Sequence, residues 1–534
     1  MHLRYVAALL PCCLLLALPE ARAEDWTLRL AEEMDLTYEI ENSPALRWKK
    51  AQASCVRFLR AESFAELDEL LSALTGYTVW TEKDQQQVPQ LFDLLAQLCH
   101  QRPPLIAHWI KARPDSAHAH LVRSKVHVKT GYAARGGGYA HQVSPEGWKV
   151  WHAEIPKAKA AVEQALALRP DHPVALGQRL RVDRCGSASP EDFQTHLAQA
   201  RERTPNNHQV HQEAITYLLP RWHGSWTQIW ELIADLEQKS PGHPVVLETR
   251  VEAHIIRANE LARGARDRKR AIQGYVQQPK VKAELAQAFQ RTRERFAASM
   301  VPARIQLSLG SQLGFYTPEE TDGFAYELAN KHDPTWMINV AMHLVRNPEA
   351  SPGPNREKFI DHSLLLGTLL GEEKVKGALL QRLIGAQANK PARPKAAYLL
   401  CRVLGQQGSR HFRGLAIEYL RNGVGVTQDE AGAVAEHLAQ AEAGNESCAF
   451  HYGMIRWAGS SGTKVDRELA LEWTLKAAEA GQPQAVRFMC EVDLGLRERP
   501  KDLERAARWV RLAESKRFPD ADQLRRLYRQ AAGE

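Results

Sequence analysis

The strongest constraint on the fold is a spacing pattern that occurs three times between residues 158 and 241. In each copy, three apolar residues separated by four and then three positions are followed, five residues later, by proline. The copies are Ala158, Val162, Ala165 and Pro170; Phe193, Leu197, Ala200 and Pro205; and Ile229, Ile233, Leu236 and Pro241. This spacing places the apolar side chains on one face of a helix, and proline ends that helix. The prolines are 35 and 36 residues apart, so the sequence predicts a series of similar packing helices.

The middle of the chain resembles a tetratricopeptide-type array, whose period is about 34 residues and whose second helix carries small or apolar residues before a proline. The turns repeat as well, with RPDHP at 169, TPNNH at 204 and SPGHP at 240, and with an earlier RPDSAH at 113. The resemblance implies an all-α, right-handed helical-repeat solenoid in which each helix pair needs its neighbours to bury an apolar face. We expect this tetratricopeptide-like domain to span residues 113–298.

A second array is expected near the C-terminus. Asp466, Ala470, Trp473 and Gly481 are followed 36 residues later by Asp502, Ala506, Trp509 and Arg517, and an earlier copy begins at Asp429. These segments resemble Sel1-like repeats, a relative of the tetratricopeptide repeat. Asp is expected to cap a helix, Gly to allow a left-handed turn, and the two Trp residues to fill equivalent spaces between helix pairs. We expect Sel1-like repeats over residues 411–534, connecting helices over 299–410 and an N-terminal helical region over 24–112.

Residues 1–23 have the features of a cleavable signal peptide. A positively charged start precedes the apolar residues 6–18, and Ala21-Arg22-Ala23 presents the small-x-small pattern that signal peptidase recognises. The apolar segment is shorter than the roughly 20 residues that a membrane-spanning helix needs. We therefore predict cleavage before Glu24, a periplasmic or secreted protein, and no integral membrane span after cleavage.

Removal of this segment leaves six cysteines. They are Cys55, Cys99, Cys185, Cys401, Cys448 and Cys490. Export permits disulfides, and the spacing of the six contains no CxxC motif of the kind used by zinc sites or thioredoxin-like proteins. The favoured pair is Cys55 with Cys99, because both lie on helical patterns that flank residues 64–98. The alternative is that the six serve as small buried apolar residues.

Composition excludes several classes of protein. Hydrophobic residues make up 44% of the 534 residues and charged residues 25%, which is ordinary globular usage and a poor fit to a disordered chain or a multi-span membrane protein. The net charge of +7 is small for this length. A basic cluster between residues 263 and 282 lacks the interleaved aromatic residues that single-stranded nucleic acids stack on, so no nucleic-acid partner is predicted.

The most unusual string is LPRWHGSWTQIW, residues 219–230. It resembles a Pro-Arg-Trp-x-Gly-Ser signature of an uncharacterised bacterial helical family. The upstream loop that begins at Arg135 fits the same family. No activity is established for that family, so the resemblance implies none here. The candidate binding residues are Arg135, Arg221, Trp222, His223 and Trp226, because Trp and Arg contribute much of the energy of protein interfaces. The alternative is a tight Gly turn with the indoles wedged between helices, which we favour.

Motifs for catalysis or metal binding are not found. There is no GxSxG motif and no phosphate-binding loop, and Glu62-Ser63-Phe64 is similar only to the start of the lytic transglycosylase motif. The histidines near the repeats lack HExxH or carboxylate spacing, which favours solvated or capping roles. They are His118, His120, His152, His208 and His211. No catalytic residue, metal or cofactor is predicted.

These patterns together predict a non-enzymatic scaffold that binds another protein or a peptide outside the cytoplasm. By family analogy, one alternative is an immunity-type inhibitor of a secreted toxin. The other alternative is a cell-wall-acting enzyme that uses the repeats as a scaffold. A shallow surface lined by Trp, Tyr and Arg would favour binding, whereas a deep pocket with an acid or nucleophile and an orienting partner would favour catalysis.

Overall fold

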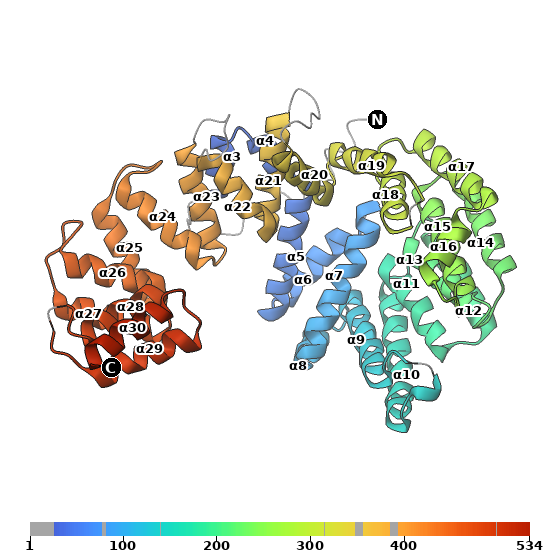
Figure 1. Cartoon of the computed structure of the whole chain (residues 1–534). Helices are drawn as coiled ribbons and strands as arrows, with labels where there is room; N and C mark the ends of the chain where they lie inside the picture. The colour runs from blue at the N-terminus through green and yellow to red at the C-terminus, as the bar shows by residue number, and fades with distance from the viewer. Residues whose placement is uncertain are drawn as a thin grey trace. The chain divides into compact units, whose positions relative to one another are not determined.

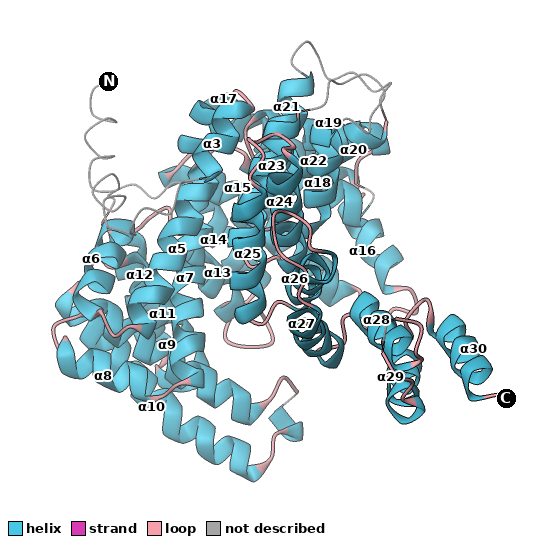
Figure 2. Cartoon of the chain, turned by 90° about the vertical axis from the view of Figure 1, so that its left-hand side faces the viewer, coloured by secondary structure: helices cyan, strands magenta, loops and turns pink. Residues whose placement is uncertain are grey.

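The computed structural model describes residues 26–76, 82–138, 140–313, 315–347, 356–384, 393–497 and 499–533. The predicted signal peptide lies outside these residues. Within them the chain forms 28 α-helices, a 3-10 turn at Ala140–Gln142 and a π-helical turn at Asp183–Ser187. Figure 2 shows these residues as helices joined by loops, with no strand drawn. The all-α prediction is confirmed for this part of the chain.

The helices form two compact units. The first contains described residues 44–347, and the second contains residues 26–43 and 356–533. Successive helices pack on one another within each unit, in the order in which Figure 1 colours them. The predicted stacking of sequential helix pairs is therefore confirmed.

The first unit begins at Pro44. Its helices are α5 (Pro44–Arg60), α6 (Phe64–Thr75), α7 (Glu82–Gln101), α8 (Pro104–Ala112), α9 (Ala117–Arg135), α10 (Pro145–Leu168), α11 (Pro173–Val182), α12 (Pro190–Arg203), α13 (His208–Tyr217), α14 (Trp226–Lys239), α15 (Pro244–Leu261), α16 (Arg268–Val276), α17 (Pro279–Arg295), α18 (Val301–Leu313), α19 (Pro318–Asn330) and α20 (Pro334–Arg346).

The second unit combines the first two described helices with the C-terminal part of the chain. Its helices are α3 (Trp26–Glu33), α4 (Thr37–Glu41), α21 (Arg356–Leu370), α22 (Glu373–Ile384), α23 (Pro394–Gln406), α24 (Arg410–Asn422), α25 (Glu430–Glu442), α26 (Glu446–Ala458), α27 (Arg467–Glu479), α28 (Pro483–Asp493), α29 (Leu503–Ser515) and α30 (Ala521–Ala532). Helix α3 packs on α23, where the Trp26 ring meets Tyr398 edge-on and lies beneath the Arg402 guanidinium.

The repeated turns of the first unit end in helix N-caps. The side chains of Ser116, His172, Asn207 and His243 each accept a hydrogen bond from a backbone N–H at the start of the following helix. Capping satisfies a donor that the first helical turn leaves unpaired. Each of these residues is the fourth residue of its motif, in RPDSAH, RPDHP, TPNNH and SPGHP respectively. The motif that repeats in the sequence therefore marks the start of a helix.

Residues one period apart contact each other directly. Ser124 Oγ donates to the Ala158 carbonyl, Asn207 Nδ2 donates to the Pro173 carbonyl and Arg250 pairs with Glu284, and each pair is separated by 34 residues. The second unit contains an equivalent pair, Arg402 with Glu436. A separation equal to the repeat length is what stacked helix pairs require, since each residue then meets its counterpart in the next pair.

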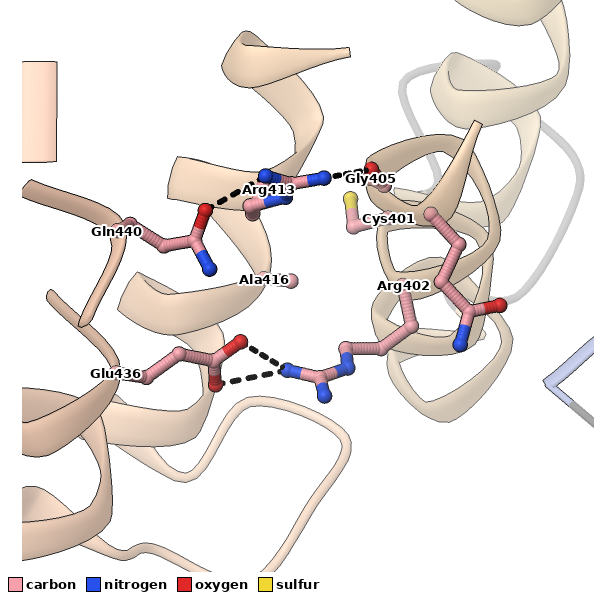
Figure 3. Close-up of a pocket in the computed structure, with 8 residues that line it drawn as sticks. Cys401, Arg402, Gly405, Arg413, Ala416, Glu436 and Gln440 are labelled. Atoms are coloured by element: carbon pink, nitrogen blue, oxygen red, sulfur yellow. Dashed lines mark hydrogen bonds and ion pairs between the residues drawn. The ribbon is translucent and has the colours of Figure 1, made fainter. Parts of the chain in front are cut away.

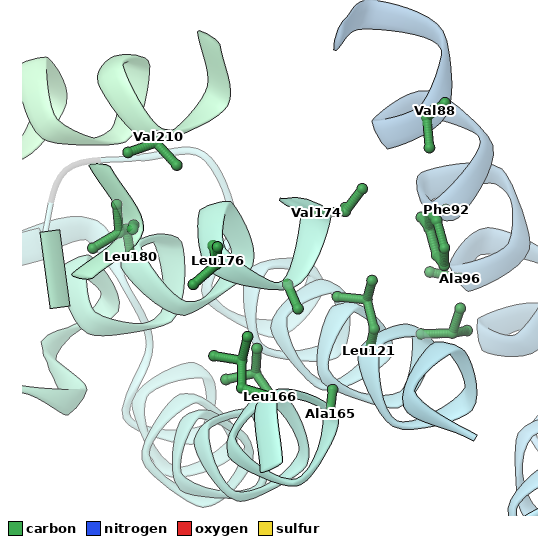
Figure 4. Packing of buried hydrophobic residues seen from close by; sticks show 14 of the residues in the cluster. Val88, Phe92, Ala96, Leu121, Ala165, Leu166, Val174, Leu176, Leu180 and Val210 are labelled. Atoms are coloured by element: carbon green, nitrogen blue, oxygen red, sulfur yellow. The ribbon is translucent and has the colours of Figure 1, made fainter. Parts of the chain in front are cut away.

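A continuous apolar core runs from α5 to α15 in the first unit (Figure 4). Trp109, Phe92 and Phe193 are among its largest fully buried side chains. The N-terminal helical region and the tetratricopeptide-like helices share this core, because Val88 and Phe92 of α7 belong to the same cluster as Val174 of α11. Neither segment therefore buries its apolar face alone.

Two histidines are buried inside this core. His172 Nδ1 accepts from the Ala175 N–H, which places the ring proton on Nε2 facing His118 Nδ1 at 3.1 Å. His118 Nε2 then donates to Ser72 Oγ at 3.0 Å. Burial lowers the pKa of His118 to about 3 and that of His172 well below its usual value, so both rings are neutral.

The C-terminal repeats have the predicted capping geometry. Asp429, Asp466 and Asp502 begin α25, α27 and α29 with closely similar dihedral angles, and each carboxylate accepts a backbone N–H bond three residues on. The chain leaves the first two of these helices through left-handed glycines, Gly444 (φ 84°) and Gly481 (φ 90°). The Asp and Gly roles predicted from the sequence are confirmed.

The two tryptophans of these repeats belong to one apolar cluster but differ in burial. Trp509 is buried and donates from Nε1 to Asp493 at 2.9 Å. Trp473 is half-buried, meets Tyr452 edge-on and has the Lys476 ammonium 4.2 Å from its ring centre. The prediction that the two tryptophans fill equivalent spaces is therefore wrong, because the helices that precede them offer different partners, Tyr452 in α26 and Asp493 in α28.

The predicted Cys55–Cys99 disulfide is wrong. All six cysteines of the described residues are free and buried. Burial raises the pKa of the Cys55 and Cys99 thiols to about 12, so they behave as small apolar residues. Among the described helices, none combines the length and apolar character that crossing a bilayer requires.

Candidate binding surface

The string LPRWHGSW forms the connection between α13 and α14. A side chain at Gly224 would place its Cβ 2.6 Å from the Leu218 carbonyl oxygen, so only glycine allows the loop to fold back this closely. Ser225 then caps α14 by accepting the Gln228 N–H. The tight Gly turn expected from the sequence is present, but the expectation that the indoles are wedged between helices is wrong for Trp222, which is exposed.

Trp222 stands at the exposed tip of this loop, with 55% of its surface accessible. On either side, Arg221 pairs with Glu260 of α15 at 3.1 Å, and the His223 ring stacks on Tyr217 with ring centres 4.5 Å apart. Tyr217 in turn stacks on the buried Phe193. The exposed indole therefore lies on a loop whose neighbouring side chains, Arg221 and His223, are fixed by contacts with α15 and with the core. These contacts restrict the motion of the loop.

Trp226 lies at the start of α14 and is half-buried. The Arg257 guanidinium of α15 lies 4.8 Å from its ring centre, and Trp230, one helical turn on, packs against it with ring centres 6.2 Å apart. Trp230 also contacts His254, whose Nδ1 lies 3.1 Å from the Tyr275 hydroxyl. We call the group formed by Arg221, Trp222, His223, Trp226 and Arg257 the Trp222 surface.

Arg135 is not part of the Trp222 surface. It ends α9, donates to the Gly136 and Gly138 carbonyls, and lies over the rings of Trp148 and Trp151 in α10. Its contacts lie in the α9–α10 hairpin, whereas those of the other four predicted residues lie around α13, α14 and α15. The five candidate residues therefore form two groups.

Three residues around this surface, Arg257, Glu260 and Trp230, were not among the candidates that the sequence pattern indicated. A signal existed for Trp230, because residues four apart in a helix share a face with Trp226. Nothing in the sequence indicated Arg257 or Glu260, since they come from the next helix of the stack. Their positions depend on how α15 packs beside α14.

The second unit contains a hollow of about 260 Å³ between α23, α24 and α25 (Figure 3). Both Glu436 carboxylate oxygens accept bonds from Arg402, at 2.7 and 2.8 Å. Arg413 is likewise held by Gln440 and the Gly405 carbonyl. Burial raises the pKa of the Cys401 thiol to about 12, so it is not a thiolate nucleophile. The polar groups of this hollow hold the repeat helices together.

Glu62 is not placed as a buried general acid would be. It lies in the turn between α5 and α6 with φ of 57°, and its side chain is 46% exposed. His108, which is also exposed, contacts it at 3.1 Å. A glycosidic acid needs an apolar surrounding that holds its proton at neutral pH, and this turn is open to water.

Three of the histidines for which a solvated or capping role was predicted are buried, namely His118, His120 and His211. The prediction is wrong for these three, since none is solvated and none is the N-cap of its helix. His120 Nε2 and His211 Nε2 each contact the carbonyl of the turn proline six residues earlier, Pro114 and Pro205. His152 stacks on Trp148, and His208 lies 3.6 Å from Glu252. A group with metal-ligand geometry occurs instead in the second unit, where Glu418, His437 and His451 converge.

No protein-family model matches the chain, and no curated protein matches it. The chain is similar to the solved structure of a Sel1 repeat protein from Oxalobacter formigenes, with 18% identity, 60% of this chain and 84% of that chain covered, and a TM-score of 0.40. It is also similar to c5321, a protective antigen of uropathogenic Escherichia coli with an SLR fold, with 12% identity, coverage of 91% and 94%, and a TM-score of 0.27. A third similarity is to human IFIT1, with 12% identity, coverage of 87% and 96%, and a TM-score of 0.20.

Proposed function

We propose that the protein is an exported, non-enzymatic helical-repeat scaffold and that its Trp222 surface binds an acidic segment of another protein or a peptide. The observation that carries this proposal is the exposed Trp222, held between Arg221 and His223 on a loop anchored to the core. A large exposed aromatic side chain with a fixed base loses little conformational entropy on binding. Trp and Arg are the residue types most often found at interface hot spots.

The charge of the surface supports an acidic partner. The Arg257 guanidinium lies over the Trp226 ring, and within the described part of the chain it has no carboxylate partner. Its half-buried position reduces the hydration that an incoming carboxylate would have to displace. A carboxylate of the bound segment would supply the ion-pair partner that this arginine lacks among the described residues.

The test is affinity capture from a periplasmic extract, followed by titration of the purified partner. Wild-type protein and a Leu496→Ala control should retain the same partner, because Leu496 is a similarly exposed apolar residue, 59% accessible, in the second unit. Trp222→Ala should weaken binding by at least about tenfold, the loss typical of a hot-spot residue. Equal affinity of Trp222→Ala and wild type, or cell-wall cleavage by protein that captures no partner, would reject the proposal.

Export is tested separately by expressing the full chain and measuring the mass of the mature protein. Cleavage before Glu24 would leave two residues ahead of α3, which begins at Trp26. The expected result is a mature protein in the periplasmic fraction with Glu24 at its N-terminus. An uncleaved chain in the cytoplasmic fraction would contradict the export proposal and would leave the binding test unaffected.

A further inference from the structure

Three side chains in the second unit converge from three successive helices. Glu418 lies on α24, His437 on α25 and His451 on α26, and one ligand atom from each lies within 4.8 Å of the others. His437 Nε2 is 3.3 Å from Glu418 Oε1, and His451 Nδ1 is 3.7 Å from the same oxygen. No short sequence motif connects them, because each comes from a different element of the repeat stack.

The two separations from Glu418 Oε1, 3.3 and 3.7 Å, are close to the spacing of ligands around a small metal ion, and the two histidine ligand atoms lie within 4.8 Å of each other. In a tetrahedral zinc site, bonds of about 2.0–2.1 Å place neighbouring ligand atoms about 3.3 Å apart. Two imidazoles and one carboxylate form a common ligand set for zinc. From these residues we propose that Glu418, His437 and His451 form a binding site for a divalent transition-metal ion of the zinc class, with water as the fourth ligand.

The surroundings hold the ligands in place. Arg421 binds the other carboxylate oxygen, Glu418 Oε2, and so keeps Oε1 turned toward the two histidines. Hydrogen bonds to the non-ligating oxygen are a regular feature of metal-binding carboxylates. His437 is fully buried between the helices, and its ring meets that of His451 at 84° with centres 5.4 Å apart.

Each of the two histidines has a ring nitrogen that forms no hydrogen bond. His437 Nδ1 and His451 Nδ1 are buried and have no hydrogen-bond partner. A buried polar atom without a partner costs free energy, and coordination through His451 Nδ1 would satisfy one of the two.

An ion can reach the site from one side. A hollow of about 210 Å³ opens beside Glu418 and His451 and is further lined by Arg421, Met454 and Ser460. The His451 side chain is 42% exposed to solvent, whereas the His437 side chain is fully buried on the inner side of the site. Three protein ligands and a water-filled fourth position are typical of zinc sites that remain accessible.

The test uses the full chain stripped of metal with a chelator and titrated with Zn²⁺ alone. We expect one equivalent to bind, and Co²⁺ in place of Zn²⁺ to give the visible absorption of a tetrahedral site. Zn²⁺ at about 100 times its dissociation constant should raise the melting temperature of the second unit by roughly 5–10 °C. Failure of the wild-type chain to bind either ion would overturn the proposal.

The decisive variant is His451→Gln, because this partly exposed side chain can change without opening the core. It should weaken Zn²⁺ binding by at least about tenfold and abolish the thermal shift, and Glu418→Gln should do the same. His411→Gln is the matched control, an exposed histidine on the same helix as Glu418, and it should bind like wild type. Unchanged affinity in His451→Gln, or an equal loss in His411→Gln, would refute the site.

Discussion

Replacing Arg517 with glycine should stabilise the second unit. Arg517 has φ of +55°, and it follows α29 as Gly444 follows α25 and Gly481 follows α27. The backbone hydrogen bonds are also equivalent: the N–H of Arg517 donates to Glu514 O, and the next N–H donates to the carbonyl of Ala513. The last repeat therefore keeps the left-handed turn with a residue that is poorly suited to it.

The magnitude follows from the backbone. A left-handed conformation costs an L-residue about 1–2 kcal/mol. Glycine avoids this cost but loses about 0.5–1 kcal/mol through its greater freedom in the unfolded chain. The exposed Arg517 side chain forms no hydrogen bond or ion pair with other described residues. Arg517→Gly should therefore raise the free energy of unfolding by about 0.5–1 kcal/mol, or roughly 1–4 °C in melting temperature.

Scanning calorimetry of the full chain measures the shift, and two further variants isolate the cause. Arg517→Ala removes the guanidinium but keeps a Cβ, so it should leave the stability of the second unit almost unchanged. Gly481→Ala makes the reverse change at the equivalent turn, where no atom lies within 4 Å of the added Cβ, and should destabilise by a similar amount. A melting temperature of Arg517→Gly equal to or below that of wild type would refute the backbone argument.

Three further perturbations follow from buried groups. Because the pKa of His118 is about 3 in the fold and near 6.5 when unfolded, the unfolded chain binds more protons below pH 6.5, so stability is lost as pH falls from 6.5 toward 3. The pKa of His172, whose ring contacts that of His118, is also lowered in the fold. His172→Asn removes this titrating ring but keeps a capping side chain, so it should reduce the slope of the free energy of unfolding against pH by up to about 1.4 kcal/mol per pH unit. An unchanged slope would contradict the conclusion that both rings are neutral in the fold. The six buried thiols of the described residues, Cys55 and Cys99 included, should resist a thiol reagent in the native protein. All six should react after unfolding without reductant, and a smaller number would indicate a disulfide. Gly224→Ala should destabilise the first unit by about 1–3 kcal/mol in urea titration, because its Cβ would meet a backbone carbonyl, and wild-type stability would show that the loop can relax.

Much of the local structure could be predicted from sequence spacing. The apolar spacing before Pro170, Pro205 and Pro241 indicated helices that end at these prolines, and α10, α12 and α14 each end two residues before them. The Asp and Gly positions of the C-terminal repeats indicated where helices begin and turn. Such features depend on a few neighbouring residues, so periodicity and capping rules are sufficient to find them.

Candidate sites were harder to predict. The string around Trp222 was found because its composition is unusual, yet Arg257, which completes that surface, lies 35 residues further along the chain in α15. The Glu418, His437 and His451 group was missed altogether. Its members are separated by 19 and 14 residues, spacings that match no metal-binding motif.

The sequence by itself determined that this chain forms stacked helices, because the helices of the repeats carry apolar faces, capping residues and stop signals. Only the tertiary structure decided which polar side chains meet, that the cysteines are buried and free, and that α3 packs on α23 near the other end of the chain. The physical reason is that local signals act through backbone geometry over a few residues. Contacts between helices depend on the packing of side chains that lie one repeat or most of the chain apart.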